Sequence, residues 1–200
     1  MKTSLVLSVL SAAGLCLGVG CESKTTYVNP NSSRLVTSVG TIDVQDFAQA
    51  ADSMTQSLID NLINAGKLQS AVPSEPALMA ISRIQNNTAQ QLDTDMLVKK
   101  IRVALNRTGK VQTSTTIQYG GAEDPLAAEQ QAQAPANPQK RPRAPDYTLS
   151  GKIIEMRDQA GNIRQASYVF QLSLSSPDGI AVWEDEKTIV KQSTRPAVGF

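Results

Sequence analysis

The sequence predicts a two-layer α/β sandwich (an α+β sandwich), in which two helices cover one face of a mixed sheet of about five strands. Between Ala166 and Leu174 every second side chain is apolar, which indicates a strand with one buried face. Apolar stretches flank this strand at residues 147–156 and 180–190, each joined to it by a short polar connection. The three stretches predict a C-terminal antiparallel meander, whose apolar face the helices upstream must cover.

The N-terminal segment, residues 1–20, has the pattern of a bacterial lipoprotein signal peptide. Lys2 precedes an apolar run over residues 5–17, which is too short for a membrane span but typical of a signal-peptide core. Small residues then lead to Cys21, which this pattern identifies as the lipid-attachment residue. An ordinary secretory signal with an incidental cysteine is the alternative. Glu22 follows the cysteine, and resemblance to Gram-negative sorting rules then favours the outer membrane.

The rest of the chain divides by composition into a tether, one folded domain and a tail. Ser, Thr and Asn are frequent in residues 21–40, which predicts a flexible tether. The domain spans residues 41–192 and is interrupted at 120–145 by an insertion rich in Pro, Gln and Ala, where regular structure is not expected. Residues 193–200 form a C-terminal tail.

The first element of the domain is an amphipathic helix that begins after Asp43 and ends near Gly66. Asp43 is a favourable N-cap, and Gly66 can adopt the left-handed conformation that ends many helices. One face of this helix is apolar, because hydrophobic residues recur at spacings of three and four. They are Phe47, Ala51, Met54, Leu58 and Leu62.

A strand, a turn, a second helix and another strand follow in that order. The pattern predicts a strand at 77–84, a turn at 86–88, and a strand at 111–118 that is rich in β-branched residues. Asp93 or Thr94 caps the helix between them, and a glycine ends it. The buried side of this helix consists of Met96, Leu97, Ile101, Ala104 and Leu105.

Three features of the meander carry a specific expectation. The Pro177-Asp178-Gly179 sequence is a turn signature, because proline presets φ and glycine tolerates a positive φ. Gly151 lies inside an apolar strand and predicts a bulge or a close approach of another chain segment. Trp183 fits half-buried packing, with a contact to a partner protein as the alternative.

Composition excludes several classes of function. The chain has no histidine, so Ser–His–Asp catalysis, Cys–His catalysis and histidine-ligated zinc are excluded. Both cysteines, Cys16 and Cys21, precede the domain, which therefore has neither a disulfide nor a thiol nucleophile. Lysine and arginine number 19 against 18 acids, and loss of residues 1–20 removes only Lys2. A neutral chain has no general attraction to nucleic acid, so no such partner is expected.

The charged clusters of the domain indicate no catalytic pair. Residues 184–186 are acidic, but alternation places the middle carboxylate on the opposite strand face, as in a solvated edge strand. A glycosidase needs two carboxylates across a cleft, so no enzyme, cofactor or small-molecule substrate is expected. Lys140, Arg141 and Arg143 form the basic cluster of the insertion. They read as a solvated loop or, alternatively, as a contact for an acidic partner or a lipid headgroup.

Four segments, taken with the lipid signal, carry a family resemblance: residues 79–110, 147–153, 168–172 and 182–187. Their order and spacing resemble the LpoB family, the outer-membrane lipoprotein activators of penicillin-binding proteins. The resemblance covers Thr41–Gln192, nearly the whole domain. It implies a fold similar to a TolB-type N-terminal domain.

The same resemblance implies a regulator without catalysis. Such a protein would be anchored to the outer membrane through acylated Cys21, would face the periplasm, and would bind a non-catalytic domain of a bifunctional class A penicillin-binding protein. It would stimulate glycan polymerisation and peptide crosslinking. Some family members carry a long Pro-rich tether, whereas here the Pro-rich material lies inside the domain. An accessory lipoprotein of an envelope secretion or assembly complex is the alternative function.

Overall fold

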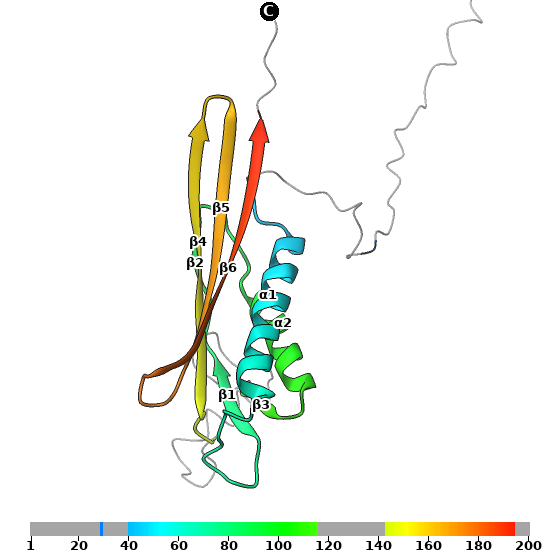
Figure 1. Ribbon diagram of the computed structural model, residues 1–200, viewed down its shortest axis with the longest axis vertical. Coiled ribbons are helices and arrows are strands. Elements are labelled where there is room, and N and C mark those ends of the chain that lie inside the picture. Colours follow the sequence, from blue (N-terminus) through cyan, green and yellow to red (C-terminus); the bar gives the residue numbers. More distant parts are fainter. Residues whose placement is uncertain (1–28, 30–39, 116–142, 195–200) are drawn as a thin grey trace, which may run out of the picture. The chain divides into compact units, whose positions relative to one another are not determined.

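The computed structural model describes residue 29, residues 40–115 and residues 143–194. The elements of these residues form two layers, a mixed sheet and two helices on one of its faces (Figure 1). The predicted α/β sandwich with a C-terminal meander is confirmed, although the sheet has six strands among the described residues. The elements are α1 (Val44–Leu58), a π-helical turn (Ile59–Ile63), β1 (Ala77–Ile81), β2 (Gln85–Asn87), α2 (Asp95–Arg107), β3 (Val111–Thr113), β4 (Tyr147–Ala160), β5 (Ile163–Ser175) and β6 (Ala181–Thr194).

The sheet combines a short parallel half with a long antiparallel half. The strand order is β3-β1-β4-β5-β6, and β2 pairs with β4 beyond the end of β1. β3, β1, β2 and β4 are parallel where they pair, and α2 lies in the crossover from β2 to β3. β4, β5 and β6 form the antiparallel meander.

The predicted turn at residues 86–88 is wrong in part, because Gln85–Asn87 forms the extra strand β2. This polar segment pairs along β4 without burying its side chains, and the chain bends after it. The strand predicted at 77–84 ends at Ile81, and the strand predicted at 111–118 ends at Thr113. The last residues of the second prediction, and the insertion up to residue 142, lie outside the described residues.

α1 begins where the sequence predicts, and together with the π-helical turn that follows it the helical segment ends near Gly66, as predicted. The Asp43 carboxylate accepts hydrogen bonds from the N–H groups of Gln45 and Asp46, at 3.0 and 3.1 Å. Asp46 in turn accepts from the Asp43 N–H at 2.8 Å, which completes a capping box. After Leu58 the helix continues as the π-helical turn, and Gly66 follows with a φ of 66°.

α2 combines the two capping alternatives. Thr94 occupies the N-cap position, but its side chain makes no capping hydrogen bond. The Asp93 carboxylate accepts from the Asp95 N–H at 2.9 Å and so binds one of the free donors of the first turn. Gly109, with a φ of 66°, follows the end of the helix.

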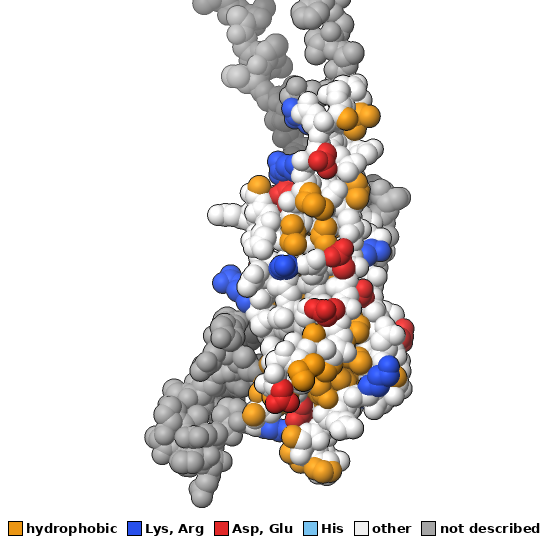
Figure 2. Space-filling view, turned by 60° about the vertical axis from the view of Figure 1, so that its left-hand side comes forward, with side chains coloured by type: hydrophobic (Ala, Val, Ile, Leu, Met, Phe, Trp, Pro, Cys, Tyr) orange, Lys and Arg blue, Asp and Glu red, His pale blue; other side chains and the backbone are white. Residues whose placement is uncertain are grey.

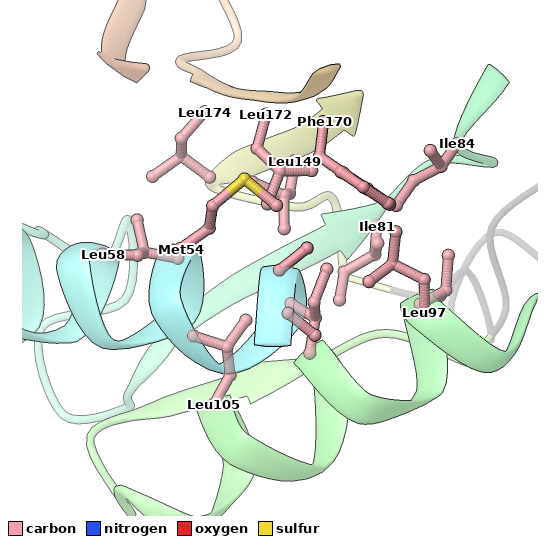
Figure 3. Close-up of a cluster of buried hydrophobic side chains, with 14 of the residues drawn as sticks. Met54, Leu58, Ile81, Ile84, Leu97, Leu105, Leu149, Phe170, Leu172 and Leu174 are labelled. Carbon is pink, nitrogen blue, oxygen red and sulfur yellow. The ribbon is translucent and has the colours of Figure 1, made fainter. Parts of the chain in front are cut away.

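The core lies between the helices and the sheet (Figure 3). Phe47 and Met54 reach it from α1, and Leu97 reaches it from α2. The rings of Phe47 and Phe170 meet edge to face, with centroids 5.9 Å apart. The sheet contributes the residues of β5 that alternation assigns to the buried face, as predicted: Ala166, Tyr168, Phe170, Leu172 and Leu174. Leu149 and Ile153 of β4 lie beside them in the core.

The meander strands are longer than predicted. β4 and β5 stay paired through Ala160 and Ile163, and Gly161-Asn162 makes the tight turn with a φ of 59° at the glycine. The strand end predicted at residue 156 is therefore wrong, because backbone pairing in a hairpin does not require buried side chains. Gly179 has a φ of 77° in the predicted turn between β5 and β6.

Strand β5 approaches Gly151 closely, which confirms the second of the two predictions for this glycine, a bulge or a close approach. A Cβ added there would lie 2.5 Å from the carbonyl oxygen of Gln171 and 2.6 Å from Cδ2 of Leu172. Leu172 is its cross-strand partner and lies 3% exposed over the glycine. The β-bulge of the meander lies elsewhere, where Leu174 and Ser175 pair with β6.

Candidate protein-interaction surface

The face of the meander turned away from the helices is the candidate interaction surface, called here the outer face. Alternation and register place Lys152, Gln171 and Glu186 side by side on it, one from each strand. The side of the molecule in Figure 2 lies away from α1 and α2 in Figure 1, and it shows hydrophobic side chains between charged ones. No described helix covers this face, so its side chains are open to a partner.

Two rows of mainly apolar side chains cross the middle of the outer face. In one row Ile154 lies beside Val169, and in the next Met156 and Val190 flank Ser167. Met156 and Val190 are each 52% exposed, whereas Ser167 and Val169 are each 7% exposed between their neighbours. We call the four aliphatic residues of these rows the apolar centre.

Acidic side chains of β6 lie on the same face as the apolar centre. The Ser173 hydroxyl donates to Glu184 Oε1 at 2.8 Å, and the Gln171 amide donates to Glu186 Oε2 at 2.6 Å. Asp185 lies on the other face, as its alternation with its neighbours predicts. An open hollow of about 460 Å³ lies between these strands. Fixed carboxylates beside an apolar area can accept hydrogen bonds from a partner protein.

β6 is an edge strand over its full length in the described part of the chain. It pairs with β5 and with no other described strand. Its residues Glu184 and Glu186 are exposed, and charged side chains are what natural edge strands use against unwanted pairing. The interpretation of this stretch as a solvated edge strand is confirmed.

Trp183 lies on the helix-facing side of β6. It pairs with Leu174, is 9% exposed and belongs to the buried core cluster. Trp183 therefore packs in the core of the domain. Its role as a contact for a partner protein stays a prediction. The predicted lipid-attachment residue Cys21 lies outside the described residues, as do Lys140 and Arg141.

Arg143, the remaining member of the predicted basic cluster, forms an intramolecular network. Its Nη1 donates to Glu75 Oε2 at 2.9 Å, and its Nη2 donates to Asp146 Oδ2 at 2.5 Å and Ser70 Oγ at 2.6 Å. Asp146, which is 7% exposed, also accepts from the Leu78 N–H at 2.7 Å. The network joins the start of β4 to the start of β1.

A second polar cluster, called here the N-terminal clamp, fixes the first residues of the domain to β6. Lys191 Nζ donates to the Thr41 carbonyl at 2.8 Å, to Asp43 at 2.9 Å and to Asp46 at 2.5 Å. Burial alone would raise the pKa of Asp43, but hydrogen bonds from Lys191 and from two backbone N–H groups lower it below its ordinary value. Burial alone would lower the pKa of Lys191. The two carboxylate partners have the opposite and larger effect, so the pKa lies above its ordinary value.

Tyr168 extends the clamp to β5. Its hydroxyl donates to the Gly40 carbonyl at 2.8 Å and lies 3.3 Å from Glu155 Oε1. Burial and the nearby Glu155 carboxylate raise the pKa of Tyr168 to about 12. Burial raises the pKa of Glu155, but the Ala89 N–H and the Arg157 guanidinium hold it below its ordinary value. The domain therefore begins at a point held by two strands.

The sequence did not predict the apolar centre, the Arg143 network or the N-terminal clamp. The adjacent Ile153 and Ile154 are a signal that both faces of β4 carry apolar groups, and it could have indicated the apolar centre. No local pattern indicates the partners of Lys191 or Arg143, because these partners come from distant segments. Among the described residues no helix is long and apolar enough to cross a membrane, and no three potential ligand side chains gather around a metal position.

Comparison with known families gives one match that spans this fold. The model of the family described as peptidoglycan-synthase activator LpoB matches residues 46–189. The matched range begins in α1, includes α2, and ends in β6. No curated protein matches the sequence.

Several solved structures resemble this chain at low sequence identity. The LpoB C-terminal domain from Salmonella enterica is 12% identical, with 72% of this chain and 98% of that chain covered and a TM-score of 0.42. The NMR structure of E. coli LpoB is 14% identical, with 96% and 88% covered and a TM-score of 0.40. The PelC dodecamer from Paraburkholderia phytofirmans is 21% identical, with 57% and 72% covered and a TM-score of 0.30.

Proposed function

The chain belongs to the LpoB family of peptidoglycan-synthase activators, and on this premise we propose that it binds and activates a bifunctional class A penicillin-binding protein. The observation that carries the proposal is the family match over residues 46–189, which includes both helices and most of the meander. The family is one of activators, and its members act on a synthase rather than on a small-molecule substrate.

The proposal includes a lipid anchor at Cys21 in the outer membrane, with the domain in the periplasm. The signal-peptide pattern of residues 1–20 supports it. Several acyl chains would hold the domain firmly, because each buried CH₂ contributes ~0.8 kcal/mol. Nineteen positions separate Cys21 from Gly40, and a flexible chain of that length has a typical reach of about 25 Å.

The outer face is the proposed contact with the synthase. The helices cover the other face of the meander, so the apolar centre is available to a partner while the core is not. Met156 and Val190 supply exposed apolar area, and Glu184 and Glu186 supply carboxylates next to it. An apolar middle with polar groups around it is the usual anatomy of a protein interface.

The test uses the mature chain, residues 21–200 with Cys21→Ser, added to the purified class A synthase of the same cell. Glycan polymerisation on a fluorescent lipid-linked substrate should rise several-fold, and peptide crosslinking should rise with it. No effect on any class A synthase of that cell would contradict the proposal. Co-purification with a pore assembly in place of a synthase would favour the accessory role instead.

Surface variants separate the contact from the fold. Met156→Glu and Val190→Glu should each weaken the stimulation about tenfold in apparent affinity, as expected for residues inside an interface. Both side chains are more than half exposed, so the unfolding free energy should change little. Val103→Glu is the matched control, since Val103 is 39% exposed on α2. An equal loss in the control, or none in the outer-face variants, would show that the synthase binds elsewhere.

A further inference from the structure

The hairpin of β4 and β5 extends past the start of α1 (Figure 1). The strand register places two arginines on the helix-facing side of this hairpin end. Arg157 and Arg164 line an open hollow of about 500 Å³ together with Gln159 and Ser193. Gly40, where the described domain begins, lines the same hollow. The place where the tether joins the domain is therefore also a place with two cationic groups.

Arg157 is held in position by a carboxylate that has other partners. Its Nε donates to Glu155 Oε1, which leaves the two terminal nitrogens of the guanidinium for another acceptor. The Glu155 side chain is 5% exposed and also accepts from the Ala89 N–H, whereas the Arg157 side chain is 58% exposed. Glu155 thus orients Arg157. Of the two side chains, the guanidinium is exposed to solvent and the carboxylate is buried.

Arg164 adds a second guanidinium without a described partner. In the described part of the chain it forms no hydrogen bond or ion pair, and register places it diagonally across from Arg157 on the same face. Asp158 also lines the hollow, but alternation directs its side chain toward the outer face. Two nearby guanidinium groups repel each other, and an anion bound between them relieves that repulsion.

A phosphate group fits this arrangement best. The planar guanidinium donates paired N–H groups that match phosphate oxygens, and two such groups can bind one phosphate from two sides. The Gln159 amide and the Ser193 hydroxyl add neutral donors at the same hollow.

We propose that this hollow binds the phosphate of an anionic phospholipid headgroup and holds the hairpin end of the domain against the membrane. The proposal rests on the lipid anchor of the proposed function. Tyr168 fixes Gly40 beside the hollow, and a flexible tether from Cys21 would hold both at a typical distance of about 25 Å from the anchor. Tethering raises the effective concentration of headgroups at the hollow far above that of a free phosphate.

Docking of this kind would set the orientation of the domain. Ile163, 41% exposed at the hairpin turn, would then lie at the level of the headgroups. The opposite end of the meander, with Glu184 and Glu186, would be directed away from that membrane. Orientation would thus present the acidic part of the outer face toward a synthase.

The test is co-sedimentation of the mature chain, residues 21–200 with Cys21→Ser, with lipid vesicles. Vesicles of phosphatidylglycerol and phosphatidylcholine are compared with vesicles of phosphatidylcholine alone. Each basic residue near an anionic surface strengthens binding about fivefold, so Arg157→Gln/Arg164→Gln should lower the partition coefficient by roughly tenfold or more. The matched control, Arg83→Gln/Arg107→Gln, removes the same charge from exposed sites elsewhere and should change it less than about twofold.

Three results would overturn the proposal. Absence of binding to the anionic vesicles is the first, and equal losses in the two double variants is the second, since it would indicate general attraction. The third is a change in the NMR chemical shift of the Arg164 side chain with millimolar inorganic phosphate, in the absence of any vesicle binding. That result would assign the hollow to a soluble anion.

Circular dichroism checks that each variant is folded. The single variant Arg164→Gln removes no described contact and keeps the test decisive if the double variant unfolds. The vesicle assay contains no synthase, and the synthase assay needs no anionic vesicle. A failure of lipid docking is therefore distinct from a failure of the proposed activation.

Discussion

Replacing Gly151 with alanine tests the closest packing in the meander. The new Cβ would lie 2.5 Å from the Gln171 carbonyl oxygen, whereas ordinary contacts begin at 3.4 Å, so β4 and β5 must separate by roughly 0.9 Å at this point. Gln171 pairs with Lys152 in the middle of the hairpin, and its backbone cannot rotate away. Overpacking costs about 1–3 kcal/mol, and a clash with backbone belongs at the upper end of that range.

Urea unfolding followed by circular dichroism measures this loss. With an m-value of about 2 kcal/mol/M, a loss of about 3 kcal/mol lowers the midpoint by about 1.5 M. Gly161→Ala is the control, because nothing lies within 4 Å of its added Cβ and only its φ of 59° opposes the change. That left-handed conformation costs about 1 kcal/mol. A loss for Gly151→Ala no larger than the control's would refute the packing argument.

Two polar clusters give three further predictions. Lys191→Met should lower the unfolding free energy by about 3 kcal/mol, because it leaves two partly buried carboxylates without their shared cation. Lys187→Met, at a half-exposed position of the same strand, should cost less than about 1 kcal/mol, and urea midpoints of the two variants test the difference. Asp43 and Glu155 have pKa values below their ordinary 3.8 and 4.5, so the ionised carboxylates stabilise the folded state above those values. This contribution should be lost as pH falls through the folded pKa, and a urea midpoint unchanged between about pH 5 and pH 2 would contradict it. Asp146→Asn should cost about 2 kcal/mol through its weakened hydrogen bonds and leave synthase stimulation unchanged in the polymerisation assay.

Local rules account for the parts of the fold that the sequence predicted. Asp43 caps α1 because its carboxylate reaches donors two and three residues away, and such a signal is complete within one stretch of sequence. The turn at Gly179 and the alternation from Ala166 to Leu174 are equally local. These signals suffice to indicate a covered meander with helices upstream.

The polar clusters could not be predicted, because their members lie far apart in the sequence. Lys191 binds Asp43, 148 positions before it, and Arg143 binds Glu75, 68 positions before it. No spacing rule connects residues at such separations until the strands are placed side by side. β2 was missed for a related reason, since Gln85–Asn87 is polar and becomes a strand only through its pairing with β4.

The candidate surface depends on the register of β6, and one bulge sets that register. Ser175 pairs with Ala181, but Leu174 pairs with Trp183, so Val182 is an extra residue on β6. Without the bulge, Val182 would pair with Leu174 and Trp183 would pair with Ser173 and face the solvent, while Glu184, Glu186 and Val190 would turn toward the helices. The bulge therefore buries the tryptophan and creates the outer face in one step. A one-residue offset leaves composition and periodicity unchanged, which is why the sequence indicated the strand but not the surface that it presents.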